Sequence, residues 1–394
     1  MIQEIFLDNN ATTQPLACVR EAVLDALGNG FGNPSSANSF GMRARTQITQ
    51  ARRSLADILK ASEEQVLFTS GATEANNWVL NHAVLIQPGG RIVTSAVEHS
   101  SVLRTVDCLE QQGVEVVRLP VDSVGLVKMD DLSAAVTSDT ALVSIQWVNN
   151  ETGVQQPIEE IQAHCQRSGV LFHSDAAQAV GKVSVDLQRT PVDFLSLTAH
   201  KFHGPQGVGA LICRRPRSVI PQLHGGSQEF GLRAGTENVP GIVGAGAAAE
   251  LRFRQFLAVT AKLQSLRDRF ETKVLASVPD VHVNGSVSSR VCNTTNLCFE
   301  GVDGDALVAR LDQQGVQCSQ SSACTSQRPE PSYVLRAMGL SEEQAWSSLR
   351  FSFSELNTEA EVDSAVEVLV KLVRQLRNFS GQIRSADEHH TEVA

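Results

Sequence analysis

Short apolar runs, rich in β-branched and aromatic residues, recur through the first half of the chain and predict strands. They cover residues 65–68, 91–97, 114–120, 141–148, 169–175 and 193–198. Most are separated by enough residues for a crossover helix, which is the pattern of βαβ units in a largely parallel, buried sheet. The run at 207–215 follows a Gly/Pro turn closely, so we expect it to join the sheet as an antiparallel strand. The pattern predicts an α/β fold.

Apolar residues recur with helical spacing in three further segments, 42–60, 244–276 and 359–378. Between the last two, residues 279–300 return to short strands, and a further helix follows. This change of pattern near residue 255 predicts a domain boundary. We expect a large α/β domain over residues 15–255 and a smaller α+β domain built from residues 1–14 and 256–394.

The composition excludes several classes of protein. Of 394 residues, 42% are hydrophobic and 19% are charged, which supports a large core and argues against intrinsic disorder. A formal charge of −10 without a long Lys/Arg run argues against nucleic-acid binding. No apolar stretch approaches the ~20 residues of a membrane-spanning helix, and the N-terminus carries acidic residues where a signal peptide has Lys or Arg. We expect a soluble, cytoplasmic protein.

The chain has eight cysteines, and no pair of them has the C-x-x-C spacing. This spacing pattern offers neither a zinc ribbon nor a thioredoxin-type redox motif, and no metal site is expected. Without a secretory signal, the thiols are expected to stay reduced.

Polar residues follow several predicted strands, at the edge where functional groups of open α/β sheets gather. Ser70-Gly71-Ala72-Thr73 leads from a strand into a helix, and small residues there leave backbone N–H groups free to cradle a phosphate. The next strand ends at His99, and the strand at 141–148 is followed by 149–151, Asn-Asn-Glu. Each of these features alone is also typical of an ordinary turn.

The two following strands end in groups that point to a cofactor. Asp175 ends the strand at 169–175, and a carboxylate after such an apolar run is expected to be buried and to need a cationic partner. His200 and Lys201 end the strand at 193–198. A lysine, an aspartate, a histidine able to stack and a phosphate cradle are what a pyridoxal phosphate (PLP) site requires. The sequence therefore predicts a PLP-dependent enzyme.

Eight sequence blocks strengthen this interpretation, because in order they resemble the signature blocks of cysteine desulfurases. These are PLP enzymes of the class V aminotransferase group, with the aspartate-aminotransferase fold (fold type I). The resemblance extends from about residue 5 to 375 and implies a mostly parallel sheet with helices on both faces, plus a smaller α+β domain. The blocks are LDNNATT (7–13), SGATEANN (70–77), VEHSS (97–101), VNNETG (148–153), HSDAAQ (173–178), TAHKFHGPQGVGAL (198–211), RAGTEN (233–238) and SSACTS (321–326).

The resemblance implies a role for each matching residue around the cofactor. Lys201 would form the Schiff base with PLP, and Asp175 would pair with the pyridinium nitrogen. His99 would stack on the ring and help to move protons, and Gln178 would hydrogen-bond the phenolic oxygen. The residues expected to hold the phosphate are Ala72, Thr73, Thr198 and His200.

Three further roles concern the substrate and a second subunit. Asn150 would lie near both cofactor and substrate, and Arg350 would bind the substrate α-carboxylate, a role that suits its bidentate fork. Thr236 would reach the phosphate of the partner subunit, which implies a homodimer.

Cys324 differs from the other cysteines in its surroundings. Small polar residues precede it and a Pro-rich stretch follows, which is typical of an exposed loop and favours reactivity. It lies 26 residues before Arg350, as in the branch of the family with a long catalytic loop. The resemblance implies that Cys324 takes sulfur from L-cysteine as a persulfide, leaves L-alanine, and passes the sulfur to an acceptor such as an iron–sulfur scaffold.

Departures and alternatives remain. The family commonly has a histidine where this chain has Ala37-Asn38, and Cys318 is an additional thiol that either receives sulfur or only packs. A selenocysteine lyase, a cysteine-sulfinate desulfinase or a class V aminotransferase would share the cofactor site. A scaffold that has lost activity is disfavoured, because no expected catalytic residue is missing.

Overall fold

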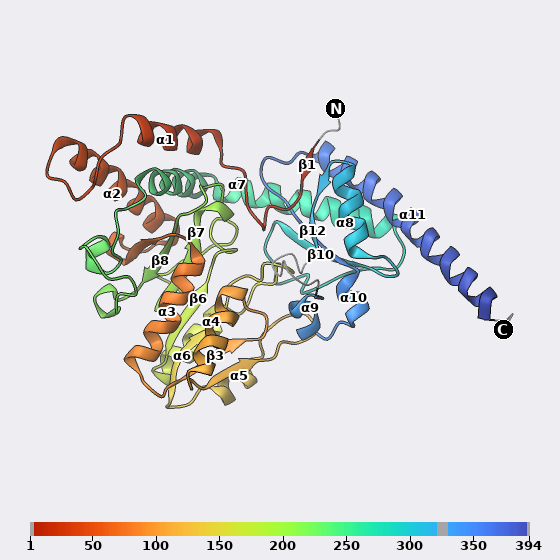
Figure 1. Ribbon diagram of the computed structural model, residues 1–394, viewed down its shortest axis with the longest axis horizontal. Coiled ribbons are helices and arrows are strands. Elements are labelled where there is room, and N and C mark those ends of the chain that lie inside the picture. Colours follow the sequence, from red (N-terminus) through yellow and green to blue (C-terminus); the bar gives the residue numbers. More distant parts are fainter. Residues whose placement is uncertain (1–3, 321–329, 392–394) are drawn as a thin grey trace.

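The computed structural model describes residues 4–320 and 330–391, with side chains as far as residue 378. The largest sheet within these residues has seven strands in the order β2-β8-β7-β6-β5-β3-β4 (Figure 1). Their bounds are β2 (Val66–Thr69), β8 (Gly209–Cys213), β7 (Phe194–Thr198), β6 (Leu171–Asp175), β5 (Thr140–Ser144), β3 (Arg91–Ser95) and β4 (Val116–Leu119). β8 is antiparallel to both of its neighbours, and the other adjacent pairs are parallel. The predicted parallel sheet with an antiparallel addition at 207–215 is confirmed.

Strand β5 ends at Ser144, earlier than the predicted end at residue 148. On one side the chain continues along β6, since the backbone N–H of Trp147 donates to Asp175 O at 2.9 Å. On the other side the backbone N–H of Gln146 donates to the Glu98 carboxylate, at 3.0 and 2.9 Å to its two oxygens. A side chain therefore replaces the neighbouring strand at this point, and the regular ladder stops.

Helices cover both faces of this sheet, and each face has its own hydrophobic cluster. Leu142 packs with α3 and α4, whereas the adjacent Val143 packs with α2, α6 and α7 on the opposite face. Successive side chains of a strand alternate between faces, which is why a strand buried on both faces is apolar throughout. The helices of this part are α1 (Ala17–Gly28), α2 (Ser39–Leu59), α3 (Ala72–Ile86), α4 (Ser100–Gln111), α5 (Met129–Ala135), α6 (Ile158–Ser168) and α7 (Val239–Ser277).

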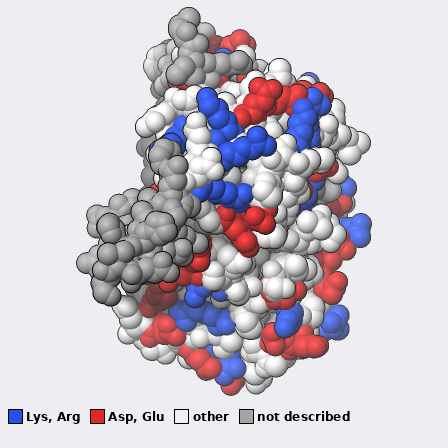
Figure 2. Space-filling model, turned by 90° about the vertical axis from the view of Figure 1, so that its right-hand side faces the viewer, with Lys and Arg blue, Asp and Glu red and all other residues white. Residues whose placement is uncertain are grey.

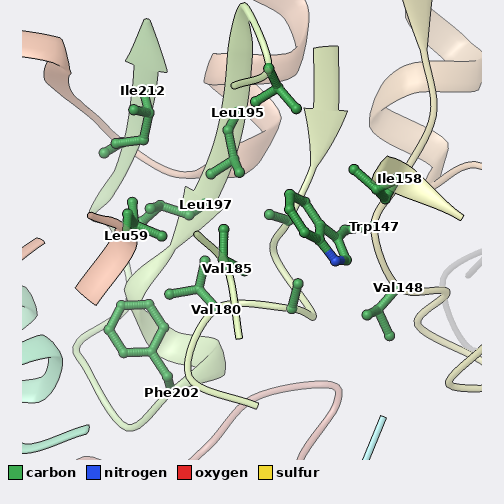
Figure 3. Packing of buried hydrophobic residues seen from close by; sticks show 14 of the residues in the cluster. Leu59, Trp147, Val148, Ile158, Val180, Val185, Leu195, Leu197, Phe202 and Ile212 are labelled. Carbon is green, nitrogen blue, oxygen red and sulfur yellow. The ribbon is translucent and has the colours of Figure 1, made fainter. Parts of the chain in front are cut away.

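Figure 3 shows how one of these clusters supports the turn after β7. Leu197 of β7 lies near Leu59 of α2, with Val180 and Phe202 below them (Figure 3). Phe202 is 2% exposed and directly follows Lys201, so its burial fixes the backbone that carries the lysine. Short 3₁₀ helices accompany such turns, at η1 (Glu63–Gln65), η2 (Ala199–Lys201), η3 (Pro216–Ser218) and η4 (Glu229–Gly231).

The C-terminal part lies beside the part that holds the seven-stranded sheet, and the long helix α7 runs from one part to the other (Figure 1). The start of α7 packs in the large cluster through Ile242, and its end packs in a separate cluster through Phe270. The predicted boundary near residue 255 falls inside this continuous helix, and the division into domains stays a prediction. Ile5 and Leu7 of the N-terminal arm also pack in the second cluster.

The second cluster lies against a sheet that, over the described residues, has four strands in the order β12-β13-β10-β9, all antiparallel. A short parallel pair, β1 and β11, lies beside it. The remaining elements are β1 (Ile5–Phe6), β9 (Val281–Val283), β10 (Thr294–Phe299), α8 (Gly304–Gln313), β11 (Val316–Gln317), β12 (Ser319–Gln320), α9 (Tyr333–Ala337), α10 (Glu342–Trp346), β13 (Ser348–Ser352) and α11 (Glu359–Thr391). Helix α11 continues beyond residue 378, where the predicted helical pattern stops.

Lys/Arg and Asp/Glu side chains are interspersed on the face that Figure 2 shows. Within the described residues, no helix combines the length and apolar character needed to cross a membrane. The seven cysteines that the structure describes are all unpaired thiols.

At the Ala37-Asn38 departure, Asn38 caps α2, its side chain accepting from the backbone N–H of Gly41 at 3.0 Å.

Candidate active site

A cavity of about 660 Å³ lies at the carboxyl ends of the sheet strands. Because β8 is antiparallel to both β2 and β7, the carboxyl end of β2 lies at the same edge as those of the parallel strands. Ten predicted site residues line this cavity, from elements far apart in the sequence. They are Ala72, Thr73, His99, Asn150, Asp175, Gln178, Thr198, His200, Lys201 and Arg350.

Lys201 ends η2, just after β7, and its side chain is held by the N-terminal arm. Its Nζ donates to the backbone carbonyls of Asn10 at 2.5 Å and Ala11 at 2.7 Å. Neither residue is among the predicted site residues, although both belong to the block LDNNATT (7–13). The signal for them is the polar run Asp8-Asn9-Asn10, which directly follows the short apolar run 5–7.

Asp175 ends β6 and is 6% exposed. One carboxylate oxygen accepts from Asn76 Nδ2 at 2.7 Å, and the other accepts from the backbone N–H of Ala177 at 2.9 Å. Asn76 is fully buried within α3 and was missed by the sequence reasoning. A polar residue among the apolar positions of a helix was the signal for it.

His99 is the N-cap of α4, and this role determines its tautomer. Its Nδ1 accepts from the backbone N–H of Ser101 at 3.1 Å, and Ser101 Oγ lies 2.8 Å from the same nitrogen. Since a backbone N–H only donates, the neutral ring carries its proton on Nε2. Burial lowers the pKa of His99, Asp175 acts against this and Lys201 adds to it. Asn76 Nδ2 also donates to Ser101 Oγ at 2.8 Å, which links His99 to Asp175.

The start of α3 forms one end of the cavity, close to β7 and β8. The first N–H groups of a helix have no intrahelical partner, so Ala72 and Thr73 present donors beside Thr198. Gly209 of β8 permits this approach, since a Cβ there would lie 2.6 Å from Gly71 Cα. His200 lies nearby, with Nδ1 3.1 Å from Thr12 Oγ1, and burial together with Lys201 lowers its pKa to about 4.

Arg350 lies on β13 of the small sheet, is 5% exposed and lines the cavity. Its Nη1 donates to Asn150 O at 3.1 Å, and its Nη2 donates to Asp8 Oδ1 at 2.6 Å. Two buried atoms here have no hydrogen-bond partner among the described residues, namely Arg350 Nε and Asn150 Oδ1. Both residues line the cavity, so its wall at this end includes one buried donor and one buried acceptor that no described residue satisfies.

Gln178 follows β6 and bonds to the arm that holds Lys201. Its Nε2 donates to Asn10 O at 2.9 Å, and its Oε1 accepts from Lys182 Nζ at 2.6 Å. Lys182 was not among the predicted site residues, and no isolated feature of its sequence context indicates its burial.

Of the two remaining predicted residues, only Thr236 lies among the described residues. It is exposed and does not line the cavity. Arg233 of the same block forms a bidentate pair with Glu74 of α3, at 2.8 and 3.0 Å, which ties this segment to the end of the cavity formed by Ala72 and Thr73. Cys324 lies outside the described residues.

Described residues on either side of 321–329 contact the site. Ser319 of β12 lines the cavity. Ser332, the N-cap of α9, donates from Oγ to the Glu151 carboxylate, and Tyr333 Oη donates to Glu98 O at 2.6 Å. Both acceptors adjoin predicted site residues, Asn150 and His99.

Comparisons with known proteins agree with this geometry. Residues 5–365 match the aminotransferase class-V family. A protein of Nostoc sp. named cysteine desulfurase is 45% identical over 377 residues, covering 95% of this chain and 94% of that protein. This chain belongs to the cysteine desulfurase family of class V aminotransferases. A solved NifS-like protein has a TM-score of 0.89 at 34% identity, covering 95% of this chain and 100% of its own. Another, titled SspA in complex with cysteine, has a TM-score of 0.79 at 33% identity over 90% of this chain and 99% of its own.

PLP is the cofactor of this family, and the residues of the cavity fit it. A phosphate matches the helix N-terminus at Ala72 and Thr73. Asp175 is a buried carboxylate within the same cavity, suited to a ring N–H, and Lys201 supplies an amine. The predicted fold type is confirmed by the solved relatives.

Proposed function

We propose that this protein is a PLP-dependent cysteine desulfurase, which converts L-cysteine to L-alanine and passes the sulfur to an acceptor protein from a persulfide on Cys324. The observation that carries the proposal is one cavity lined by Lys201, Asp175, His99 and Arg350. The first three suit a bound PLP, and the fourth suits the carboxylate of an amino acid.

Arg350 and Asn150 bind the substrate in this proposal. Arg350 Nε is buried without a partner among the described residues, and a carboxylate is the anion that its planar fork binds best. The carboxylate competes with Asp8, whose Oδ1 lies 2.6 Å from Arg350 Nη2. Asn150 Oδ1, also without a partner, accepts a hydrogen bond from the substrate.

The proton transfers are assigned to residues of the same cavity. When bound, PLP supplies an electron sink for the electron pair left on the substrate α-carbon. Asp175 keeps the ring nitrogen protonated, because Asn76 and the backbone of Ala177 hold its carboxylate in place. Lys201 Nζ takes the α-proton as its neutral amine. His99, neutral and with its proton on Nε2, would cover the ring of bound PLP and would donate from that nitrogen.

Sulfur transfer is assigned to Cys324. Its thiolate attacks the sulfur of the substrate, a sulfur–sulfur bond forms, and the bond between that sulfur and the substrate β-carbon breaks. The electron pair of the broken bond stays with the carbon side, which is protonated to give L-alanine. A thiol and L-cysteine thus yield a persulfide and L-alanine, and no external oxidant is consumed.

The test is mass spectrometry of the protein after incubation with L-cysteine, with L-alanine measured in parallel. We expect the mass of the protein to increase by one sulfur, located on Cys324. In Cys324→Ala, the rate of alanine formation should fall by roughly 10³-fold. Cys318→Ala is the matched control and should keep wild-type turnover. A sulfur gain absent from Cys324 would overturn the assignment.

The same variant distinguishes the alternatives. Sulfide or selenide release that persists in Cys324→Ala would favour a cysteine-sulfinate desulfinase or a selenocysteine lyase. Pyruvate formation from alanine and a keto acid would favour an aminotransferase. A purified protein without the yellow absorbance of bound PLP would indicate a scaffold that has lost activity.

We also propose a homodimer in which Thr236 contacts the phosphate bound by the partner. Exposed apolar side chains support an interface, including Leu24 and Leu27 of α1 and Phe40 of α2, with exposed fractions of 67%, 59% and 41%. Mixed dimers of Thr236→Ala and Lys201→Ala subunits contain one site carrying both changes and one unaltered site. We expect them to recover about half of the wild-type activity per dimer, whereas independent subunits would recover only the activity of Thr236→Ala.

The acceptor and the compartment complete the proposal. An iron–sulfur scaffold protein in the cytoplasm is the proposed destination of the sulfur. Incubating the persulfide form with a purified scaffold should move labelled sulfur from Cys324 to a scaffold thiol, and retention of the label would contradict this destination.

A further inference from the structure

Lys182 is a second lysine at the active site, and it lies deeper than Lys201. Its residue exposure is 7%, and it lies four residues after Gln178 in the turn segment that follows β6. Its Nζ donates to Gln178 Oε1 at 2.6 Å and to Asn10 Oδ1 at 3.3 Å. Burying a lysine is costly unless its donors are used, so these two bonds define its position.

Both lysines converge on one residue, Asn10. The backbone oxygen of Asn10 accepts from Lys201 Nζ at 2.5 Å and from Gln178 Nε2 at 2.9 Å, while its side-chain oxygen accepts from Lys182. Asn10 Nδ2 in turn donates to Asn150 O at 3.1 Å. A displacement of Lys182 therefore reaches Gln178 directly and Lys201 through Asn10.

We propose that Lys182 is a positioning residue that fixes the side-chain amide of Gln178, so that Gln178 presents an N–H to the ring oxygen of PLP. The inference rests on the cofactor assignment made under Proposed function. An amine has no acceptor to offer when charged, so the oxygen of the Gln178 amide must face Lys182. The amide nitrogen then faces the opposite way, where one hydrogen goes to Asn10 O and the other points to the cavity that Gln178 lines.

The charges around Lys182 add to this arrangement. Burial and the nearby cations Lys201, Arg252 and Arg350 together lower the pKa of Lys182 to about 7, with Cys292 acting against the shift. The neutral amine also carries a lone pair, but the backbone oxygen of Asn10 only accepts. It keeps Gln178 Nε2 on its own side, so the orientation of the amide is the same in either state of Lys182.

The test measures PLP binding to Lys182→Met, Gln178→Ala and the double variant. Methionine keeps the length of the side chain and removes its donors, and it relieves the cost of burying an amine. We expect Lys182→Met to weaken PLP binding to the apo-protein by about 5-fold, the effect of losing roughly one hydrogen bond. We expect its visible absorption band with PLP bound to shift as the band of Gln178→Ala does.

The double variant separates positioning from a merely structural role. If Lys182 acts through Gln178, adding Lys182→Met to Gln178→Ala changes PLP affinity by less than 2-fold. Equal effects of Lys182→Met in both backgrounds, or a wild-type band and affinity in the single variant, would overturn the proposal. Lys182→Arg, which keeps the donors, should restore the band if Lys182→Met fails to fold.

Lys60→Met is the matched control for the lost charge. Lys60 is paired with Asp186 at the surface, and its side chain is 54% exposed. PLP affinity and the absorption band are measured without L-cysteine, so they do not depend on desulfurase activity. A protein that binds PLP and makes no alanine would remove the proposed reaction while leaving this test valid.

Discussion

Arg350 Nη2 lies 2.6 Å from Asp8 Oδ1, so the guanidinium at the small-sheet end of the cavity is paired with a carboxylate of the N-terminal arm. The two residues come from opposite ends of the chain. The pair keeps a buried cation neutralised. Under the role proposed for Arg350, the binding of a substrate carboxylate would exchange one anion for another.

Arg350→Lys tests the proposed role of this residue. Lysine keeps the charge but lacks the fork, and its single ammonium group stays with Asp8. We expect the KM for L-cysteine to rise by roughly 10- to 100-fold, with kcat changed by less than about 3-fold, as for loss of binding shared by ground and transition states. Arg290→Lys, whose guanidinium pairs with Glu271 outside the cavity, is the control and should keep the KM. An unchanged KM in Arg350→Lys would exclude this role.

Asn76→Ala tests the link between Asp175 and His99. The change removes the donor to both Asp175 and Ser101 and leaves a buried carboxylate oxygen without that partner. We expect the free energy of unfolding to fall by about 1–3 kcal/mol and PLP binding to weaken. Asn81→Ala on the same helix removes only a bond to Asn77 O and serves as the control. Thermal unfolding with equal losses in the two variants would contradict the assignment.

Glu151 gives a pH dependence of stability. Burial raises its pKa from 4.5 to about 7, with Ser332 and Arg350 acting against the shift. Between these values the folded chain keeps the proton that the unfolded chain loses, so this group makes stability fall as pH rises through the interval. Glu151→Gln is neutral throughout. We therefore expect the free energy of unfolding of Glu151→Gln, relative to that of wild type, to increase by roughly 1–3 kcal/mol between pH 4.5 and pH 7. Above pH 7 this difference should stay constant.

Chemical denaturation at a series of pH values measures this difference. Glu98→Gln offers a second case, since burial raises the pKa of Glu98 to about 8, aided by Asp175. The pH interval over which Glu98→Gln gains stability relative to wild type should extend about one pH unit higher than the interval of Glu151→Gln. A difference from wild type that does not vary with pH would mean that these carboxyls are ionised in the folded protein.

Cys318 is expected to resist alkylation in the folded protein. It is half-buried and packs against the second cluster, and burial and the nearby Asp8 raise its pKa well above the ordinary value. Cys18 and Cys108 are exposed. With iodoacetamide at pH 7.5, peptide mass spectrometry should show at least ~10-fold slower modification of Cys318 than of these two. The rates should become similar in urea. Rapid labelling of folded Cys318 would favour a role in sulfur transfer over packing.

Local patterns in the sequence determined the large sheet and the polar residues at its edge. The apolar runs at 169–175 and 193–198 fit strands buried on both faces, and a strand must end near its last apolar residue. Asp175 and Lys201 were therefore predicted at one edge of a parallel sheet, where carboxyl ends meet. The structure places both in one cavity.

Only the tertiary structure decided which distant residues complete this cavity. Asn76 donates to Asp175, 99 positions away in the sequence. Asn10 accepts from Lys182 and Lys201, which are 172 and 191 positions away. No local periodicity encodes such contacts. The polar groups of Asn10, Asn76 and Lys182 are buried, so each requires a partner, and the partner comes from wherever the fold brings a complementary atom. The sequence by itself determined the chemistry available at the strand ends, and the packing of the arm and the small sheet decided how those groups are held.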